Sequence, residues 1–488
     1  MQVDMLLVHP PYHRRRGSGI VFPLGLGYLT SVARDAGFSI DVLDLAAAVP
    51  SLNASDLEKA STILARALEA NPPRLAIGMG PLTTSAARSL RPLIDVCRRV
   101  CPGVPIVCGG PLTSIPGQDW LFFDELKVDA TVVGDGEIAL IDLLGCLDLG
   151  KSASSCPGVR TRGRDDVAPR VDSLDDLPDP DRKYLEDPNG AYRLSLRRSV
   201  TEGPFATIMA SRGCPHRCDY CLSGTISAGS YRRRTVNSIV AEMQRLQDRG
   251  GVAHCAFYDD CFFPSGKTLT AEIAEFAREI DHAEVAMTWQ MEMRPDVASC
   301  LTSESLALLE AAGCRQINLG IETARASHGD ALGKATDPTR IAEACRLIAG
   351  SSDISLSATF ILGGPGETLS TADQTIEYSL TLGLAFAHFY PLELYPGTKL
   401  WESINADRPP RWWYEAVTSD SRVWGELLYE SLELAEGTLL DLVKQGYHRF
   451  YEREEWQDQA RRRFGTRFAS IERDLRNLMD DRFRFEEW

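Results

Sequence analysis

Short apolar runs alternate with amphipathic stretches over the first part of the chain. The runs predict strands, because each is brief and is followed by Gly, Pro or Asp before an amphipathic stretch begins. The predicted strands are Asp4–His9, Ile40–Leu43, Leu75–Gly78, Ile106–Gly109 and Ala130–Val133. This β-α alternation predicts an α/β domain over residues 1–145, built on a doubly wound parallel sheet.

The loops after these strands are rich in glycine and small polar residues. Four of them read HPPYHRRRG, GMGPLTTS, GGPLTS and GDGE. Ligands of Rossmann-like sheets bind beyond the carboxyl ends of the strands, and glycine lets the backbone approach a large cofactor closely. We therefore expect a cofactor to contact Gly109, Gly110, Gly134 and Glu137.

A second β-α series follows a segment dense in proline and aspartate. That segment, SLDDLPDPDRKYLEDPNG, lies within residues 146–200 and predicts a linker. Strands are then predicted at Ala206–Ala210, His254–Asp259, Ala283–Met293, Gln316–Ile321, Ser355–Leu362 and His388–Leu394. Six βα units predict a partial (β/α)6 barrel over residues 201–398, and residues 399–488 predict a helical C-terminal region.

Charge and composition exclude several classes of protein. The 68 acidic and 52 basic residues give a net charge of −16, which argues against a nucleic-acid surface, since that would need a surplus of Lys and Arg. No apolar run is long enough to span a membrane, and the N-terminus has no pattern of a secretory signal. We therefore expect a cytoplasmic protein without nucleic-acid or membrane partners.

Three of the 13 cysteines stand close together, and their spacing predicts an iron–sulfur site. Cys214, Cys218 and Cys221 form CxxxCxxC within SRGCPHRCDYC, directly after the first strand of the second series. Three thiolates from one short loop can bind three irons of a [4Fe–4S] cluster and leave the fourth iron open. A zinc site is the alternative, but zinc sites usually show paired CxxC units or added His at set spacings.

The cysteine spacing and the motifs that follow resemble those of the radical S-adenosylmethionine (SAM) superfamily over residues 205–395. The resemblance implies that the open iron binds SAM, whose one-electron reduction gives methionine and a 5′-deoxyadenosyl radical that abstracts a substrate hydrogen. It implies an electron donor such as flavodoxin or ferredoxin. It also implies that Tyr220 packs near the adenine, and that Asp259 and Asp260, in AFYDDCFFPS, approach the methionine end.

The later strands carry further candidate residues. TWQMEMRPD alternates, so Trp289, Met291 and Met293 are expected to face the helices, and Gln290, Glu292 and Arg294 the barrel lumen. A carboxylate and a guanidinium at neighbouring inward positions form a structural ion pair or hold a ligand, and both readings stay open.

Two further motifs follow the fourth and fifth strands. The resemblance implies that Glu322, at the end of NLGIET, contacts SAM, and that Gly363 and Gly364, in FILGGPGET, let the backbone lie against the adenine. We take Glu292, Arg294 and Glu322 as candidate catalytic residues. The triplet Arg232–Arg234 is expected either to anchor the SAM carboxylate or the linker, or to form a solvated helix start.

The order of a doubly wound domain, a linker and CxxxCxxC resembles the cobalamin-dependent branch of the superfamily. The matching segments are HPPYHRRRGSG with PLGLGYL, then GGPLTS, GDGE and, near the C-terminus, GYHRFYERE. The resemblance implies bound cobalamin, although the chain lacks the Asp-x-His-x-x-Gly loop that supplies an axial histidine in other cobalamin proteins. A Rossmann-like domain that no longer binds cobalamin is the alternative. His9, after the first strand, is expected to be solvated.

Two reactions remain open. In the first, which the resemblance implies, cobalamin hands a methyl group to a carbon or phosphorus radical of a small natural-product intermediate. In the second, the N-terminal domain is structural, and a polyhydroxylated amino sugar of the aminoglycoside type is dehydrated or rearranged with acid–base help from lumen carboxylates such as Glu292, Glu322 and Glu393. An electron-transfer or sensing protein and a tRNA methylthiotransferase fit the motifs less well.

Overall fold

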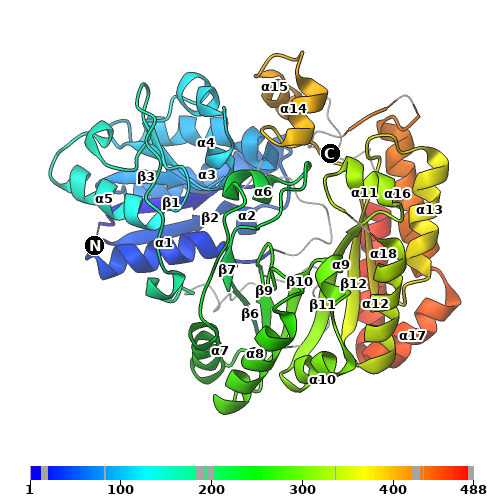
Figure 1. Ribbon diagram of the computed structural model, residues 1–488. Coiled ribbons are helices and arrows are strands. Elements are labelled where there is room, and N and C mark those ends of the chain that lie inside the picture. The colour runs from blue at the N-terminus through cyan, green and yellow to red at the C-terminus, as the bar shows by residue number, and fades with distance from the viewer. Residues whose placement is uncertain are drawn as a thin grey trace.

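The chain folds into a doubly wound domain, a six-stranded partial barrel and a set of C-terminal helices (Figure 1). The computed structural model describes residues 2–12, 20–81, 84–182, 192, 194, 203–335, 337–419, 429–431 and 433–481. Part of the HPPYHRRRG loop and part of the predicted linker therefore lie outside the described residues.

The N-terminal sheet is parallel throughout, with the order β2-β1-β3-β4-β5, as in flavodoxin-like folds. Its strands are β1 (Met5–His9), β2 (Ile40–Asp44), β3 (Ala76–Met79), β4 (Ile106–Cys108) and β5 (Ala130–Thr131). Its helices are α1 (Leu24–Asp35), α2 (Leu45–Ala48), α3 (Ala54–Ala70), α4 (Ala87–Val100) and α5 (Glu137–Asp148). The predicted strands and the doubly wound architecture are confirmed, and α5 runs past the domain boundary expected at residue 145.

Both faces of this sheet are apolar. Leu6 and Val8 of β1 pack in one core with α3 and α4, whereas Met5 and Leu7 pack in another with α1 and α5. Side chains alternate along a strand, so a strand covered on both sides reads as a continuous apolar run. This is the pattern that the sequence shows.

The barrel sheet is also parallel, with the order β13-β12-β11-β10-β9-β6, so that β6 and β13 are its two edges. Its strands are β6 (Phe205–Ile208), β9 (His254–Phe257), β10 (Thr288–Met293), β11 (Cys314–Glu322), β12 (Ser355–Leu362) and β13 (Phe386–Pro391). Its helices are α6 (Leu222–Ser227), α7 (Val236–Gly250), α8 (Leu269–His282), α9 (Pro295–Ala298), α10 (Ser303–Ala311), α11 (Ala326–Ala331), α12 (Pro338–Ser351) and α13 (Leu369–Leu380). The six βα units are confirmed, but the third strand begins at Thr288, because Glu284 has a left-handed φ of 52° that ends helix α8 in a turn.

The two faces of the barrel sheet differ in polarity. Trp289, Met291 and Met293 are buried in the apolar core that the surrounding helices share, as the alternation predicts. Their neighbours on the opposite face are buried polar side chains, among them Gln290, Gln316, Asn318 and Ser357. The lumen is therefore polar.

A short antiparallel ribbon, which the apolar pattern does not predict, carries the cysteine loop. Strands β7 (Ser211–Arg212) and β8 (Arg232–Arg233) pair with each other, and residues 213–231 run between them. Two residues per strand are too few to show a period in the sequence.

The C-terminal helices divide between the two domains (Figure 1). Helices α14 (Lys399–Asn405) and α15 (Trp412–Thr418) pack on the N-terminal domain, where the buried Trp413 donates a hydrogen bond to Gln118 at 2.9 Å. Helices α16 (Glu436–Tyr451), α17 (Glu454–Phe464) and α18 (Phe468–Asp481) pack in the core of the barrel instead. The helical character predicted for this region is confirmed.

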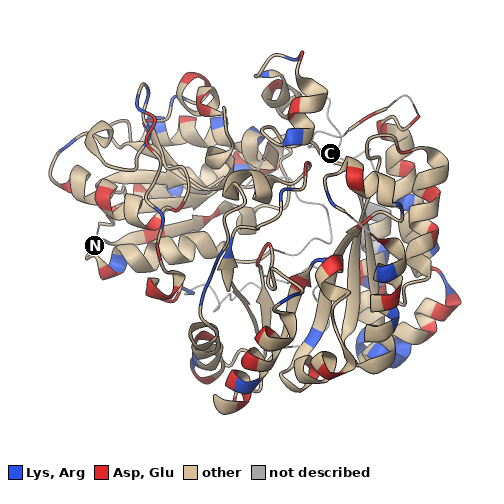
Figure 2. Cartoon of the chain, in the orientation of Figure 1, with Lys and Arg blue, Asp and Glu red and all other residues tan. Residues whose placement is uncertain are grey.

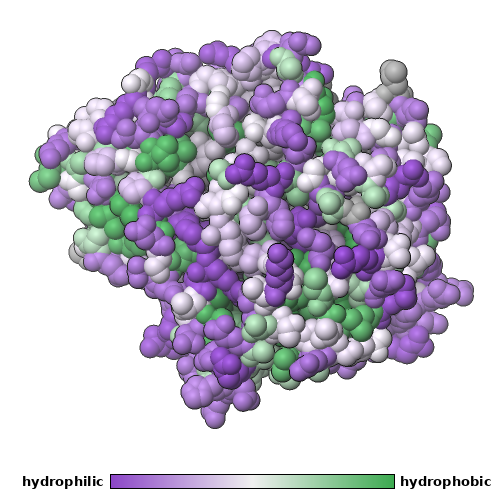
Figure 3. Space-filling model, in the orientation of Figure 1, coloured by the Kyte–Doolittle hydropathy of each residue, from purple (hydrophilic) through white to green (hydrophobic). Residues whose placement is uncertain are grey.

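Charged residues of both signs are distributed over the outer helices, and the strands of the two parallel sheets carry few of them (Figure 2). On the face shown in Figure 3, apolar residues form separate patches among hydrophilic ones. Within the described residues, no helix is both long enough and apolar enough to cross a membrane.

Candidate functional site

The cysteine loop presents three half-buried thiols at the mouth of the barrel, and hydrogen-bond donors surround them. Cys214, Cys218 and Cys221 lie between β7 and α6. The Cys261 thiol and then the His216 N–H lower the pKa of Cys214 to about 7 against the opposing effect of burial. These donors favour thiolate, the form that binds iron.

The other two thiols have donors of their own. The Arg294 guanidinium donates to Cys218 Sγ at 3.6 Å. Burial raises the pKa of Cys221, and backbone N–H groups of Ser223 and Gly224 oppose this effect. Each thiol of the loop thus has a hydrogen-bond donor beside it, and three cysteines in one loop fit a [4Fe–4S] cluster.

Among the described residues, no three His, Cys, Asp or Glu side chains lie close enough together to hold one metal ion. The ligands of a cubane cluster bind three different irons and need not meet around one point, so the cysteine loop can still hold a cluster.

Tyr220 and Glu322, both predicted to contact SAM, contact each other. The Tyr220 hydroxyl donates to Glu322 Oε1 at 3.0 Å, and the buried Lys334 ammonium donates to the same oxygen at 2.8 Å. Glu322 has a left-handed φ of 68°, a strained value for a residue other than glycine, and such strain is typical of functional sites. Lys334 had no signal in the sequence, because only the fold brings it to the carboxylate.

The two aspartates after β9 are engaged with the chain around the cysteine loop. Asp259 is buried and accepts hydrogen bonds from the Ser211 hydroxyl and the Ala210 N–H, and burial raises its pKa to about 6. Asp260 accepts a hydrogen bond from Ser223 at 2.7 Å, and burial raises its pKa. Asp259 therefore holds the strand that leads into the cysteine loop. Contact with SAM remains a prediction for Asp259 and Asp260.

Arg294 lies beside the cysteine loop, but its ion pair is with Asp296 rather than with Glu292. Its Nε lies 2.9 Å from Asp296 Oδ1. Glu292 is half-buried on the lumen face, two residues from the buried Gln290. The structure thus places Gln290, Glu292 and Arg294 on the lumen side. Their roles in catalysis and cofactor binding remain predictions.

The glycine loop after β12 is closed by Glu367, a residue that the sequence analysis did not single out. The N–H groups of Gly363 and Gly364 both donate to Glu367 Oε2. Burial raises the pKa of Glu367 to about 7. Gly363 has φ 85°, and a Cβ there would come within 2.7 Å of Leu439 on α16, so its absence of a side chain also serves packing.

The three arginines before α7 each pair with a carboxylate. Arg232 binds Asp135, Arg233 binds Glu272, and Arg234 binds the buried Glu242. The interpretation of this triplet as a solvated helix start is therefore wrong, because every one of the three guanidinium groups is drawn to an acidic partner in the fold.

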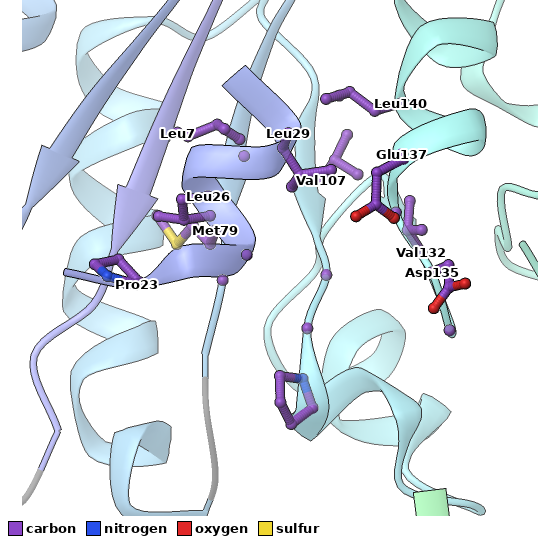
Figure 4. Close-up of a pocket in the computed structure, with 18 of the residues that line it drawn as sticks. Leu7, Pro23, Leu26, Leu29, Met79, Val107, Val132, Asp135, Glu137 and Leu140 are labelled. Carbon is purple, nitrogen blue, oxygen red and sulfur yellow. The ribbon is translucent and has the colours of Figure 1, made fainter. Parts of the chain in front are cut away.

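A cavity of about 330 Å³ opens at the carboxyl ends of the N-terminal strands (Figure 4). Apolar side chains from β1, β3, β4, α1 and α5 line most of it, and Asp135 and Glu137 stand together along one wall (Figure 4). The predicted cofactor residues Gly109, Gly110, Gly134 and Glu137 all line this cavity.

Two glycines of the cavity wall, Gly25 and Gly109, leave it open. A Cβ at Gly25 would meet nothing within 4 Å, and one at Gly109 would meet only Val132, at 3.8 Å and beyond. Side chains there would extend into free space that a ligand can fill, which fits a bulky cofactor such as cobalamin.

His9 is buried rather than solvated, contrary to expectation. Its Nδ1 lies 2.9 Å from Asp44 Oδ1, and Tyr192 donates to the other oxygen of Asp44 at 2.9 Å. The carboxyl end of β2, which lies beside β1, supplies the aspartate, and this pairing is not visible in the sequence.

Comparison with known proteins agrees with this geometry. The family model for the radical SAM superfamily matches residues 208–379, and the model for the B12 binding domain matches residues 16–144. The chain is 26% identical to an uncharacterized methyltransferase of Pyrococcus horikoshii, with 82% of this chain and 83% of that protein covered. It is 24% identical to cytidylyl-2-hydroxyethylphosphonate methyltransferase of Streptomyces wedmorensis, over 78% of this chain and 77% of that one.

Among solved structures, the chain resembles TsrM, a radical SAM methyltransferase from Kitasatospora setae, determined with cobalamin and a [4Fe–4S] cluster bound. The TM-score is 0.69 at 19% identity, over 98% of this chain and all of that one. At this identity the likeness shows the fold alone.

The chain is therefore an enzyme that carries a radical SAM domain and an N-terminal B12 binding domain. It is similar to methyltransferases, among them a cobalamin-dependent radical SAM methyltransferase of Streptomyces tokunonensis that is 30% identical over 30% of this chain and 21% of that one. The radical SAM domain implies a [4Fe–4S] cluster and SAM, and the B12 binding domain implies cobalamin. The residues around the cysteine loop and the glycine-lined cavity fit these groups.

Proposed function

We propose that this enzyme methylates a small natural-product intermediate in a reaction that depends on both SAM and cobalamin. The observation that carries the proposal is that the two sites adjoin. Met209 and Arg212, which precede the cluster cysteines, are part of the wall of the cavity in the B12 binding domain. A group held in that cavity therefore lies against the strand that leads into the cluster loop.

In this proposal the cluster and SAM supply a hydrogen-abstracting radical, and cobalamin supplies the methyl group. The chain's own residues bind and orient. Cys214, Cys218 and Cys221 hold the cluster, and the Arg294 guanidinium beside Cys218 lessens the repulsion between three thiolates. Tyr220 and Lys334 fix the Glu322 carboxylate at the end of β11, where we expect it to orient SAM.

Two kinds of relative support a small substrate. The Streptomyces wedmorensis relative acts, by its name, on cytidylyl-2-hydroxyethylphosphonate, and a TsrM structure holds a tryptophan substrate with a SAM analogue. The polar lumen beneath the site, with its buried amides and hydroxyls, offers hydrogen-bonding groups to a polar molecule of this size.

Anaerobic reconstitution tests the proposal. Protein produced with cobalamin is expected to show corrinoid absorbance, and incubation with SAM carrying a deuterated methyl group is expected to transfer that group to a substrate. Tryptophan, cytidylyl-2-hydroxyethylphosphonate and aminoglycoside-type amino sugars are the first substrates to try, with the Cys218→Ala variant as the control. Formation of 5′-deoxyadenosine and loss of water from an amino sugar, with no bound corrinoid, would show the alternative dehydration instead.

A further inference from the structure

The ribbon that carries the cluster cysteines is fastened to the cavity wall at both of its ends. Arg212 lies on β7 and its partner in register, Arg232, on β8, so the two residues stand at the entry and the exit of the cysteine loop. Both side chains reach into the other domain, to Glu137 and Asp135 of the GDGE loop.

The contacts are bidentate. Arg212 donates to both carboxylate oxygens of Glu137, with Nη1 3.1 Å from Oε2, and Nη1 also lies 3.4 Å from Asp135 Oδ1. Arg232 holds Asp135 through Nη1 at 2.7 Å and Nη2 at 3.1 Å. Paired donors facing paired acceptors fix orientation as well as distance.

The four side chains are largely withdrawn from water, with 14% of Arg212 and 6% of Glu137 exposed. Burial lowers the pKa of Arg212, but Glu137 and Asp135 more than compensate and keep it charged. A buried charge is tolerated only with its partner in place, so these ion pairs are kept only while the two domains are docked in this register.

Arg212 also touches both helices that border the cavity. Its guanidinium lies 5.5 Å from the centre of the Tyr28 ring on α1 and binds Glu137 at the first residue of α5. The same guanidinium lines the cavity, two residues before the first cluster cysteine.

We propose that Arg212 and Arg232, held by Glu137 and Asp135, are positioning residues that lock the cluster loop in register with the cavity and couple the order of one site to that of the other. The inference rests on the proposed function, because methyl transfer from cobalamin needs a fixed separation between the cluster and cobalamin. It assigns Glu137 a partner in the chain, Arg212, and the direct cofactor contact expected for Glu137 stays a prediction.

Hydrogen exchange of the reconstituted holoenzyme tests the coupling. Glu137→Gln keeps the size of the side chain and removes its charge, so amides of residues 211–221, in the other domain, should exchange about tenfold faster than in the wild type. Arg212→Gln should likewise loosen residues 134–137, and Arg212→Lys should restore part of the protection. Arg245→Gln, which breaks an exposed pair with Asp179 on the linker, is the matched control and should leave both segments unchanged.

A second experiment measures the distance between the cluster and cobalamin. Dipolar coupling between the reduced cluster and Co(II) cobalamin should give one narrow distance distribution in the wild type and a broader one in Glu137→Gln. Should Glu137→Gln fail to fold, Asp135→Asn makes the same comparison at the partner of Arg232.

Unchanged exchange of residues 211–221 in the carboxylate variants would overturn the inference, as would an equal effect of Arg245→Gln. If the wild type binds no corrinoid, the proposed function fails. The exchange experiment still decides the inference in that case, because it needs only the cluster-loaded chain.

Discussion

The two parallel sheets of this protein bury their faces in different ways. In the N-terminal sheet, Leu6 and Val8 pack on one face, Met5 and Leu7 on the other, and helices cover both. The barrel sheet has one apolar face and one polar face, and the polar face is the lumen. A sheet covered on both sides can bind a ligand only beyond its strand ends, whereas the barrel offers polar groups along its strands as well.

The cavity of the N-terminal sheet and the mouth of the barrel also differ in the side chains that form them. The cavity of the first sheet is built mainly of glycine and apolar side chains, which determine its shape. The mouth of the barrel is built of thiols, carboxylates and cations that contact one another. Substitutions should therefore act through volume at the first site and through charge and ligation at the second.

The largest effect is expected at the cluster loop. Cys218→Ala removes one of three iron ligands and should abolish cluster absorbance and the electron paramagnetic resonance signal of the reduced cluster. Cys255→Ala, at a fully buried thiol in the barrel core, should leave both intact. A cluster that survives the loss of Cys218 would contradict the assignment of the cysteine loop.

The next effect concerns the buried cation of the barrel mouth. Lys334→Met leaves Glu322 without its ammonium partner and should lower the free energy of unfolding by about 3–5 kcal/mol. Lys399→Met breaks an exposed pair with Asp219 and should cost about 0–1 kcal/mol. Urea unfolding followed by tryptophan fluorescence measures the free energy of unfolding of both variants. Equal losses in the two variants would show that the buried ion pair contributes no more than the exposed one.

A volume change tests the cavity of the first sheet. Gly25→Leu adds a side chain in open space on the cavity wall and should weaken cobalamin binding by about 1–3 kcal/mol, which is about 5- to 150-fold in Kd. Gly145→Leu makes the same change on α5, where a Cβ also meets nothing but no cavity lies, and should leave the affinity unchanged. Titration with corrinoid, followed by absorbance, distinguishes the two variants.

The last effect is a pH dependence at the glycine loop. Burial raises the pKa of Glu367 from 4.5 to about 7, so between these values the folded state binds a proton that the unfolded state has lost. This contribution to stability is present at low pH and is lost as the pH rises, by about 1.4 kcal/mol per pH unit within the window.

The Glu367→Gln variant should therefore lose less stability than the wild type between about pH 5 and about pH 7. Melting temperatures across this range measure the slope. Glu275→Gln, at an exposed carboxylate on α8, is the control, and an identical slope in all three proteins would show that Glu367 titrates normally.

Much of the fold follows from local pattern. The strands of both sheets are continuous apolar runs or clean alternations, and the side chains of β10 point as their spacing predicts. The ribbon β7–β8 and the division of the C-terminal helices between two domains do not follow, because neither leaves a period in the sequence. Trp413 packs against Gln118, a contact between residues far apart in the chain.

The sequence by itself determined the chemistry that neighbouring residues can perform: three thiols in CxxxCxxC for a cluster, and glycine-rich turns for a cavity at the strand ends. Only the tertiary structure decided which side chains are engaged with each other. Glu137 is held by Arg212, Glu322 by Lys334 and Asp259 by Ser211, three pairs whose members lie far apart in the sequence or on different elements. Spacing encodes ligands that act within one loop, but the partner of a buried charge depends on distances that exist only after the chain has folded.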